Sequence, residues 1–250
     1  MIDKKMIFIA GLHRSGTSLL YKILKEHPDI SAFSDTGVPE DEGQHLQNVY
    51  KTARYYGGPG KFALHPEAYM DENHPLASKE NAHKLYNEWI AYLDPAKEYL
   101  LEKSPPNLIR MRFLRRLFPK SYFIVILRDP IAVTLATKNK WKDSGTINEL
   151  FEHYIQAYNI CYQDMQDLDN VHLLHYEDLT ASPQKSINEI FQFLKLKPTD
   201  IKEKIQNNIN QKYYEQWREE MKKMNKKERE DFICMWNEKM KKFNYSLPLL

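Results

Sequence analysis

The stretch from Met6 to Leu20 constrains the fold of this chain more than any other segment. An apolar run over residues 6–10 suits a buried strand, Gly11 and Gly16 bracket a turn, and a hydroxyl-rich helix start follows. Glycines allow a tight turn whose N–H groups point inward, and the positive end of a helix dipole adds to the same site. The pattern therefore predicts a phosphate-binding loop between the first strand and the first helix.

The loop departs from the nucleoside-triphosphate motif at one position. Its spacing matches G-x-x-x-x-G-K-[ST], but Thr17 stands where that motif has lysine. The missing lysine normally reaches the β- and γ-phosphates beside a magnesium ion. Arg14 supplies positive charge instead. The exchange favours a donor that lacks a polyphosphate tail.

Length and composition indicate a single domain over residues 1–250, because 42% apolar and 28% charged residues are ordinary for a water-exposed globular chain of this size. Apolar runs are strand-sized, and the run within residues 1–12 is too short for a signal peptide, so we expect no membrane segment. A net charge of +2 gives no indication of a nucleic-acid partner. Cys161 and Cys234 are far apart, which fits a reducing cytoplasm and predicts neither a disulfide nor a zinc site.

Short β-rich segments alternate with helical patterns along the chain. The predicted strands cover residues 6–10, 30–33, 99–102, 122–127 and 171–175. Strands that alternate with helices imply right-handed crossovers, so we predict an α/β domain with a mainly parallel five-stranded sheet flanked by helices. Ligands should then gather at the carboxyl ends of the strands.

Four further segments carry structural expectations. Residues 17–26 and 107–118 have the apolar spacing of helices, and residues 209–243 predict an amphipathic C-terminal helical cover. Residues 49–74 contain glycines and tyrosines that predict a surface loop or lid, where an acceptor could be recognised. The arginines interleaved in the second helix predict a solvated face, with contact to an anionic substrate as the alternative: Arg110, Arg112, Arg115 and Arg116.

A second anion-binding signal lies at the end of the fourth predicted strand. The run Tyr122 to Leu127 delivers Arg128, and Pro130 suits the start of a helix. A guanidinium is planar, permanently charged and bidentate, so Arg128 is suited to a phosphate monoester. The alternative is an ion pair with Asp129 or another carboxylate.

These two motifs resemble those of sulfotransferases that use 3′-phosphoadenosine 5′-phosphosulfate (PAPS) and release 3′-phosphoadenosine 5′-phosphate (PAP). The resemblance implies that Arg128 binds the 3′-phosphate and that the loop binds the 5′-phosphosulfate through Arg14, Ser15, Gly16, Thr17 and Ser18. In the family a serine usually follows the strand-end arginine by eight positions, where this chain has Ala136. Thr137, or else Thr134, is the expected substitute.

A third match supplies a candidate catalytic cation. Residues 101–105, Leu-Glu-Lys-Ser-Pro, resemble the E-K-[ST]-P segment of glycan-directed sulfotransferases and the K-D-P segment of tyrosylprotein ones. Sulfuryl transfer needs positioning and charge stabilisation above all, so Lys103, Arg14 and the loop amides would stabilise the leaving oxygen. We expect no metal, because no cluster of metal-ligating residues is evident.

The general base has several candidates. Residues 27–36 are similar to the H-P-D-V…E-E-T segment of tyrosylprotein sulfotransferases, which aligns Asp35 with the catalytic glutamate. Asp35 is one methylene shorter, so Glu42 and His45 compete for the role, and an unrecognised residue is a further alternative.

Two downstream residues complete the predicted donor site. Tyr176, in a segment similar to the family's Y-E-D-L, faces the adenosine or packs in the core. Lys212, in a segment that loosely resembles a late N…W motif of the family, is an additional phosphate ligand.

The resemblance implies a PAPS-dependent sulfotransferase acting on a hydroxyl or amine acceptor. The interleaved arginines and the E-K-S-P segment favour a sugar or glycan hydroxyl. A nucleotide or small-molecule kinase is the first alternative, and Thr17 argues against it. A non-catalytic nucleotide-binding module is the second.

Overall fold

A five-stranded parallel sheet forms the centre of the computed structural model, which describes residues 2–249. Its strand order is β2-β3-β1-β4-β5, and every pairing is parallel. The strands are β1 (Lys5–Ala10), β2 (Ile30–Ala32), β3 (Tyr99–Lys103), β4 (Ser121–Leu127) and β5 (Val171–His175). The predicted α/β class and the five strand positions are confirmed.

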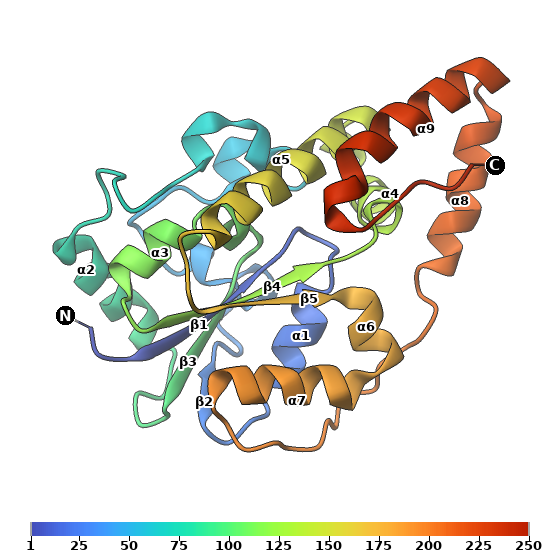
Figure 1. The fold of residues 1–250 in the computed structure, drawn as a ribbon. Helices are drawn as coiled ribbons and strands as arrows, with labels where there is room; N and C mark the ends of the chain where they lie inside the picture. Colours follow the sequence, from blue (N-terminus) through green and yellow to red (C-terminus); the bar gives the residue numbers. More distant parts are fainter. Residues whose placement is uncertain (1, 250) are drawn as a thin grey trace.

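Helices cover both faces of the sheet (Figure 1). One face packs against α1 (Thr17–Leu24), α6 (Tyr176–Ala181) and α7 (Pro183–Leu194) around a cluster of buried aliphatic residues. The other packs against α2 (Lys79–Ile90), α3 (Met111–Leu117) and α5 (Ile147–Met165), with Phe8 stacked on Phe123 at 5.5 Å between ring centroids. Apolar side chains on both faces of the strands explain why the strands read as continuous apolar runs.

The C-terminal helices lie on the side toward which β4 and β5 point (Figure 1). There α8 (Gln211–Lys222) and α9 (Lys226–Met240) meet α4 (Pro130–Lys140) and α5 in a third apolar cluster. Phe151 of α5 packs against Trp217 and Trp236 with ring centroids 5.8 and 5.2 Å apart. Burial of these large rings stabilises the attachment of the C-terminal helices to the sheet domain.

Short 3₁₀ turns join these elements. They are η1 (Pro39–Asp41), η2 (Gly43–His45), η3 (Ala53–Tyr56), η4 (Phe62–Leu64), η5 (Pro66–Ala68), η6 (Pro105–Ile109), η7 (Lys142–Ser144) and η8 (Lys241–Phe243). Within residues 2–249, no helix combines the length and the apolar character that crossing a bilayer requires.

The prediction that residues 49–74 form a surface loop is correct for the irregular backbone and for exposed residues such as Tyr55 and Leu64. The segment lacks α-helix and strand, as its composition indicates, but it folds back onto the domain and buries Phe62, Ala68 and Met70. Several of its aromatic and apolar residues thus belong to the main core. We call this anchored segment, residues 49–74, the wall.

Arg110 anchors this wall. The prediction that the interleaved arginines form a solvated face is wrong for this residue. Its side chain is 1% exposed, and it donates hydrogen bonds through Nε to the Ala68 carbonyl (3.2 Å) and through Nη2 to the Lys51 carbonyl (3.0 Å). The predicted helix over 107–118 is interrupted at this residue, between η6 and α3, which turns the guanidinium inward. Arg112, by contrast, forms partly exposed ion pairs with Glu72 and Asp167.

Candidate functional site

Polar groups follow the carboxyl ends of three neighbouring strands. β1 lies between β3 and β4, with Ile9 opposite Lys103 and Ala10 opposite Val125. The phosphate loop follows β1, Lys103 ends β3 and Arg128 follows β4. Because carboxyl ends of parallel strands share an edge, residues from distant parts of the sequence meet there.

The loop after β1 has the backbone of an anion-binding turn. Arg14 and Gly16 have positive φ angles of 69° and 104°, and Ser15 donates from its N–H (3.1 Å) and its Oγ (2.7 Å) to the Leu12 carbonyl. A Cβ at Gly16 would collide with the ring of Tyr176. The first turn of α1 contains no acidic residue of its own.

Arg128 is held against this loop. It is 5% exposed, its Nη1 donates to the Arg14 carbonyl (2.7 Å), and its guanidinium lies 4.3 Å from the Tyr176 ring centroid. Its Nε and Nη2 both donate to Oδ1 of Asn210, at 2.9 and 2.7 Å. Asn210 in turn donates to Glu177 at 2.7 Å. Within these contacts the guanidinium is paired with neutral oxygens, which leaves its charge available to an anion.

A cavity of about 350 Å³ opens beside this arginine. Its lining comes from α6 and from the segment that leads into α8, and includes Tyr176, Glu177, Thr180, Asn207, Asn210 and Tyr214. An aromatic ring and several hydrogen-bonding side chains are typical of a small-molecule site.

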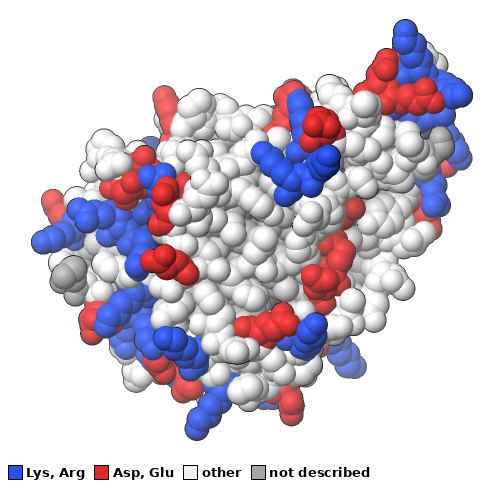
Figure 2. Space-filling model, in the orientation of Figure 1, with Lys and Arg blue, Asp and Glu red and all other residues white. Residues whose placement is uncertain are grey.

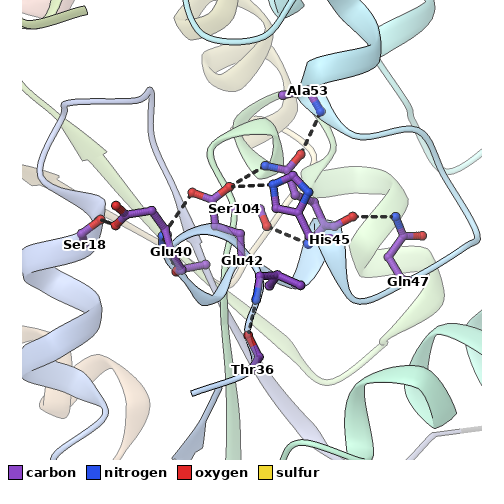
Figure 3. A network of polar contacts seen from close by, with 12 residues as sticks. Ser18, Thr36, Glu40, Glu42, His45, Gln47, Ala53 and Ser104 are labelled. Carbon is purple, nitrogen blue, oxygen red and sulfur yellow. Dashed lines mark hydrogen bonds and ion pairs between the residues drawn. The ribbon is translucent and has the colours of Figure 1, made fainter. Parts of the chain in front are cut away.

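Lys103 forms a buried ion pair at the end of β3 (Figure 3). Lys103 is 1% exposed, and its Nζ donates to Glu42 Oε1 and to the Glu40 carbonyl, each at 3.1 Å. Glu42 also accepts a hydrogen bond from the amide of Gln44, and its Oε2 lies 3.8 Å from Nε2 of His45. A charge pair out of water interacts strongly because little solvent screens it.

The turn that carries Glu40 and Glu42 is strained. Asp35, Glu40 and Asp41 have positive φ angles of 54°, 55° and 49°. Thr36 donates to Asp41 from its N–H (2.9 Å) and its Oγ1 (2.6 Å), which lowers the pKa of that carboxyl. Ser18 of the phosphate loop donates to Glu40 at 3.2 Å (Figure 3). Strain of this kind is common where a site must hold a fixed geometry.

A second buried carboxylate fixes the same turn to β3. Glu102 accepts hydrogen bonds from the Gly43 N–H (3.0 Å), the Ser104 hydroxyl and the Asn107 amide. Burial is the main cause that raises the pKa of Glu102, to about 7. A Cβ at Gly43 would lie 2.6 Å from the Glu102 side chain, so only glycine permits this close approach.

The structure separates the predicted site residues into two groups and leaves some outside both. The first group joins the loop residues 14–18 with Arg128 and Tyr176, and the second joins Lys103, Glu42 and His45. Asp35 is exposed, and among residues 2–249 its carboxylate makes no hydrogen bond. Thr137 is buried on α4, Ala136 belongs to the apolar cluster facing α8, and Lys212 lies 4.9 Å from the Tyr213 ring.

The sequence analysis missed the contacts of Glu40 and Asn210. Glu40 reaches Ser18 through a turn in which Glu40 and Asp41 have positive φ angles, and these two residue types do not signal such a conformation. Asn210 lies in the segment proposed to contact the donor, but its side chain, rather than that of Lys212, contacts Arg128.

Comparison with known proteins identifies similar chains. A model described as the sulfotransferase family matches residues 6–200. Protein-tyrosine sulfotransferase 1 of Danio rerio is 26% identical over 204 residues, which cover 78% of this chain and 54% of that protein. The chain thus spans about half the length of the curated relatives it matches.

Solved structures share the fold at lower identity. A sulfotransferase domain from the curacin biosynthetic pathway superposes with a TM-score of 0.56 and 16% identity, covering 98% of this chain and 99% of that domain. A sulfotransferase from Alicyclobacillus acidocaldarius gives a TM-score of 0.52 and 13% identity, covering 98% of each chain.

Proposed function

The chain belongs to the sulfotransferase family, whose model matches residues 6–200, and from this premise we propose that it transfers a sulfuryl group from PAPS to a hydroxyl or amine acceptor. The main support for the proposal is the hydrogen bond of 2.7 Å that Nη1 of Arg128 donates to the Arg14 carbonyl. It joins a phosphate loop and a strand-end guanidinium into one site with two anion-binding arms. A donor with separate 5′ and 3′ anionic groups fits such a site.

The residues present fit this donor. The glycine-dependent turn and the N-terminus of α1 suit the 5′-phosphosulfate, and Arg128 suits the 3′-phosphate. The cavity beside Tyr176 suits the nucleoside. Thr137 and Lys212 are secondary candidates for the 3′-phosphate. Thr137 lies on α4, which begins directly after Asp129, and Lys212 follows Asn210, the hydrogen-bond partner of Arg128, in the sequence.

Lys103 and Arg14 would stabilise the leaving oxygen. In the transfer, the acceptor oxygen bonds to sulfur while the bond between sulfur and the 5′-phosphate oxygen breaks, and PAP departs. Negative charge grows on that phosphate oxygen, and a buried ammonium stabilises it strongly because solvent does not screen the interaction. The ion pair with Glu42 holds Lys103 in place before the donor binds.

We propose that the proton of the acceptor goes to the Glu42–His45 pair. His45 lies 3.8 Å from Glu42, and burial lowers the pKa of its imidazole despite the opposing charge of Glu42, so the ring can accept a proton. Asp35 is the alternative base, on the same turn. Comparing kcat of Glu42→Gln, His45→Asn and Asp35→Asn discriminates between them.

We place the reaction in a reducing, cytoplasmic setting. Cys161 is buried and Cys234 exposed, and both are free thiols. Residues 2–249 present no group of three metal-ligating side chains arranged to hold an ion, and the proposed chemistry uses the protein's own cations.

The experiment that tests the function is a thermal shift with PAP. Saturating PAP should raise the melting temperature by roughly 5–10 °C, since a ligand at 100 times its Kd adds about 2.7 kcal/mol. Arg14→Ala and Arg128→Ala should abolish the shift, while Arg116→Ala, on an exposed arginine of α3, should leave it intact. An unmoved melting curve, or magnesium-dependent ATP hydrolysis, would contradict the proposal.

The acceptor can be sought directly. Cell extract supplied with PAPS and the protein should contain products heavier by one sulfuryl group, detected by mass spectrometry. PAP binding without any such product would favour a nucleotide-binding module over an enzyme.

A further inference from the structure

Three neighbouring cavities lie on the side of the domain where the strands begin. The central cavity, of about 140 Å³, shares Ile2 and His83 with a cavity of about 640 Å³. It shares Arg116 and Pro119 with a third cavity, of about 460 Å³. Each cavity is lined in part by residues that precede a strand. We call the residues that line these three cavities the amino-end surface.

The amino-end surface is separate from the proposed donor site. The phosphate loop follows the carboxyl end of β1, and the six residues of that strand span roughly 20 Å. Because the sheet is parallel, the amino ends of β3 and β4 lie on the same side as that of β1. A ligand on the amino-end surface would therefore leave the donor site open.

Basic side chains outnumber acidic ones on this surface. The linings of the three cavities include seven Lys and Arg residues and four Asp and Glu residues. Their net charge is +3 with histidine neutral, whereas the whole chain carries only +2. Figure 2 shows Lys and Arg side chains, with Asp and Glu among them, on the side where Figure 1 places the N-terminus, α2 and α3. The surface is a local basic patch on a nearly neutral molecule.

The four carboxylates of the patch are already bound to three of its cations. The ion pairs join Lys5 to Glu98, Lys120 to Asp3, and Arg112 to both Glu72 and Asp167. Four further cations form no ion pair within residues 2–249: Lys4, Lys79, Arg115 and Arg116. The ammonium of Lys4 donates only to the neutral carbonyls of Pro95 and Lys97. These four charges are available to an anionic partner.

Helix dipoles explain only some of these cations. Arg115 and Arg116 lie in the last turn of α3, where the dipole favours positive charge. Lys79 is the first residue of α2, where the dipole disfavours it. Ser78 already caps that helix by accepting a hydrogen bond from the Asn81 N–H (3.1 Å). Lys79 therefore does not serve the stability of its own helix, and binding of an anion accounts for its position.

The central cavity differs from the other two because much of its lining is apolar. Its apolar residues are Ile2, Ala77, Ala82, Leu117 and Pro119. Apolar cavities of about 150 Å³ hold a molecule the size of benzene. The central cavity shares residues with both of the others and so lies between them. The surface thus offers room for one apolar side chain with positive charge on either side.

We propose that the amino-end surface docks an acidic segment of a partner polypeptide. One aliphatic side chain of the segment occupies the central cavity, and Asp or Glu residues on both sides of it pair with Lys4, Lys79, Arg115 and Arg116. Nucleic acids and sulfated polysaccharides carry anionic groups along their whole length and no aliphatic side chain. They would meet the four carboxylates of the patch and leave the central cavity unfilled. The inference goes beyond the proposed function and does not depend on it.

Binding of labelled peptides, followed by fluorescence anisotropy, tests the inference. The probe is the heptapeptide E-D-E-L-D-E-D. The peptide E-D-E-S-D-E-D lacks the aliphatic side chain, and N-Q-N-L-Q-N-Q lacks the charges. The probe should bind roughly tenfold more tightly than either, because each control loses one of the two kinds of contact. Added salt should weaken binding of the probe, since the ion pairs lie at the surface.

Surface variants test the two contributions separately. Lys79→Ala/Arg116→Ala should weaken binding of the probe roughly tenfold. Ala77→Leu fills the central cavity and should remove the preference for leucine over serine. Lys226→Ala/Lys227→Ala, on exposed lysines of α9, removes the same charge elsewhere and should change nothing. All three should keep the melting temperature of the native protein and its shift with PAP.

Several results would overturn the inference. They are equal affinity for the three peptides, no saturable binding of the probe up to about 1 mM protein, and equal losses in the surface variant and the α9 control. Tighter binding of heparin or of a single-stranded oligonucleotide, lost in Lys79→Ala/Arg116→Ala, would show that the partner is a different polyanion. Loss of the PAP shift in the surface variants would show that the two sites are not separate.

Discussion

The proposed donor half of the site, around loop residues 14–18 and Arg128, and the proposed acceptor half, around Glu42 and His45, are built in different ways. Loop residues 14–18 and Arg128 lie at the ends of β1 and β4, where regular elements set their direction. Glu42 and His45 lie in and between the 3₁₀ turns that follow β2. Glu102 of β3 accepts a hydrogen bond from the Gly43 N–H, and Arg110, just before α3, donates to the Lys51 carbonyl. Local elements therefore set the positions of the donor-half residues, whereas packing between segments distant in sequence sets the positions of the acceptor-half residues. Variants in one half should therefore leave the other half working.

The face of the molecule drawn in Figure 2 has a broad area without charged side chains. Charged side chains gather around the margins of this area. The net charge of the chain is only +2. Attraction of an anionic donor must then come from the phosphate loop and Arg128 rather than from the field of the whole molecule.

The largest expected effect is on Lys103, the buried cation paired with Glu42. Lys103→Met should lower kcat by roughly 10²–10³, the effect of losing a preorganised group that stabilises developing charge, and should weaken PAP binding less than Arg128→Ala does. Kinetics and calorimetry on the same preparation measure both. Lys185→Ala, on an exposed lysine of α7, is the control.

The same variant leaves Glu42 buried and unpaired, so its stability must be measured as well. Lys103→Met/Glu42→Gln should regain stability over the single variant and remain inactive. A double variant that regains activity would show that Lys103 only neutralises Glu42.

The next effect concerns the wall of the acceptor half. Arg110→Met should lower the free energy of unfolding by roughly 2–4 kcal/mol, because two buried carbonyls, those of Ala68 and Lys51, lose their donors. PAP affinity of the folded protein should stay within a factor of about three. Urea unfolding of this variant and of Arg116→Ala measures the difference; equal stability of the two would contradict the anchoring role.

Alanine substitutions at Gly16, in the donor half, and at Gly37, outside it, form a matched pair of variants. Gly16→Ala should weaken PAP binding roughly tenfold or more, because its Cβ collides with Tyr176 and its φ is 104°. Gly37→Ala has a comparable strain, with φ at 79°, but its Cβ meets no atom within 4 Å. Calorimetry with PAP should find the affinity of Gly37→Ala unchanged. Equal losses in the two variants would mean that strain, and not the donor half in particular, controls binding.

The smallest expected effect is a pH dependence in the acceptor half. The pKa of Glu102 is raised by burial to about 7 from an ordinary 4.5, so the folded state binds more protons than the unfolded state between these values. Its contribution to stability therefore declines as pH rises through that range, by roughly 1–3 kcal/mol. Glu102→Gln should flatten the decline in urea unfolding between pH 5 and 8. Parallel profiles for the two proteins would rule out this carboxyl as the cause.

The sequence predicted the donor half better than the acceptor half for physical reasons. Apolar runs locate β1 and β4, and the residues that follow them, Arg14 and Arg128, are then placed by chain direction alone. The position of Glu42 depends instead on positive φ angles and on Gly43 contacting Glu102, which is 59 residues away. Arg110 looked solvated because its helical spacing was assumed to be continuous. No local sequence pattern indicates the position of Glu42 or the burial of Arg110.

We propose that loop residues 14–18 and Arg128 bind a nucleotide with separate 5′ and 3′ phosphates. Calorimetry with PAP and with adenosine 5′-monophosphate, on the native protein and on Arg128→Ala, tests it most directly. The native protein should bind PAP roughly 100-fold more tightly than the monophosphate, the effect of a charge-assisted contact to the 3′-phosphate, and Arg128→Ala should remove the difference. Equal affinity of the native protein for the two ligands, or tighter binding of ATP with Mg²⁺, would contradict the account.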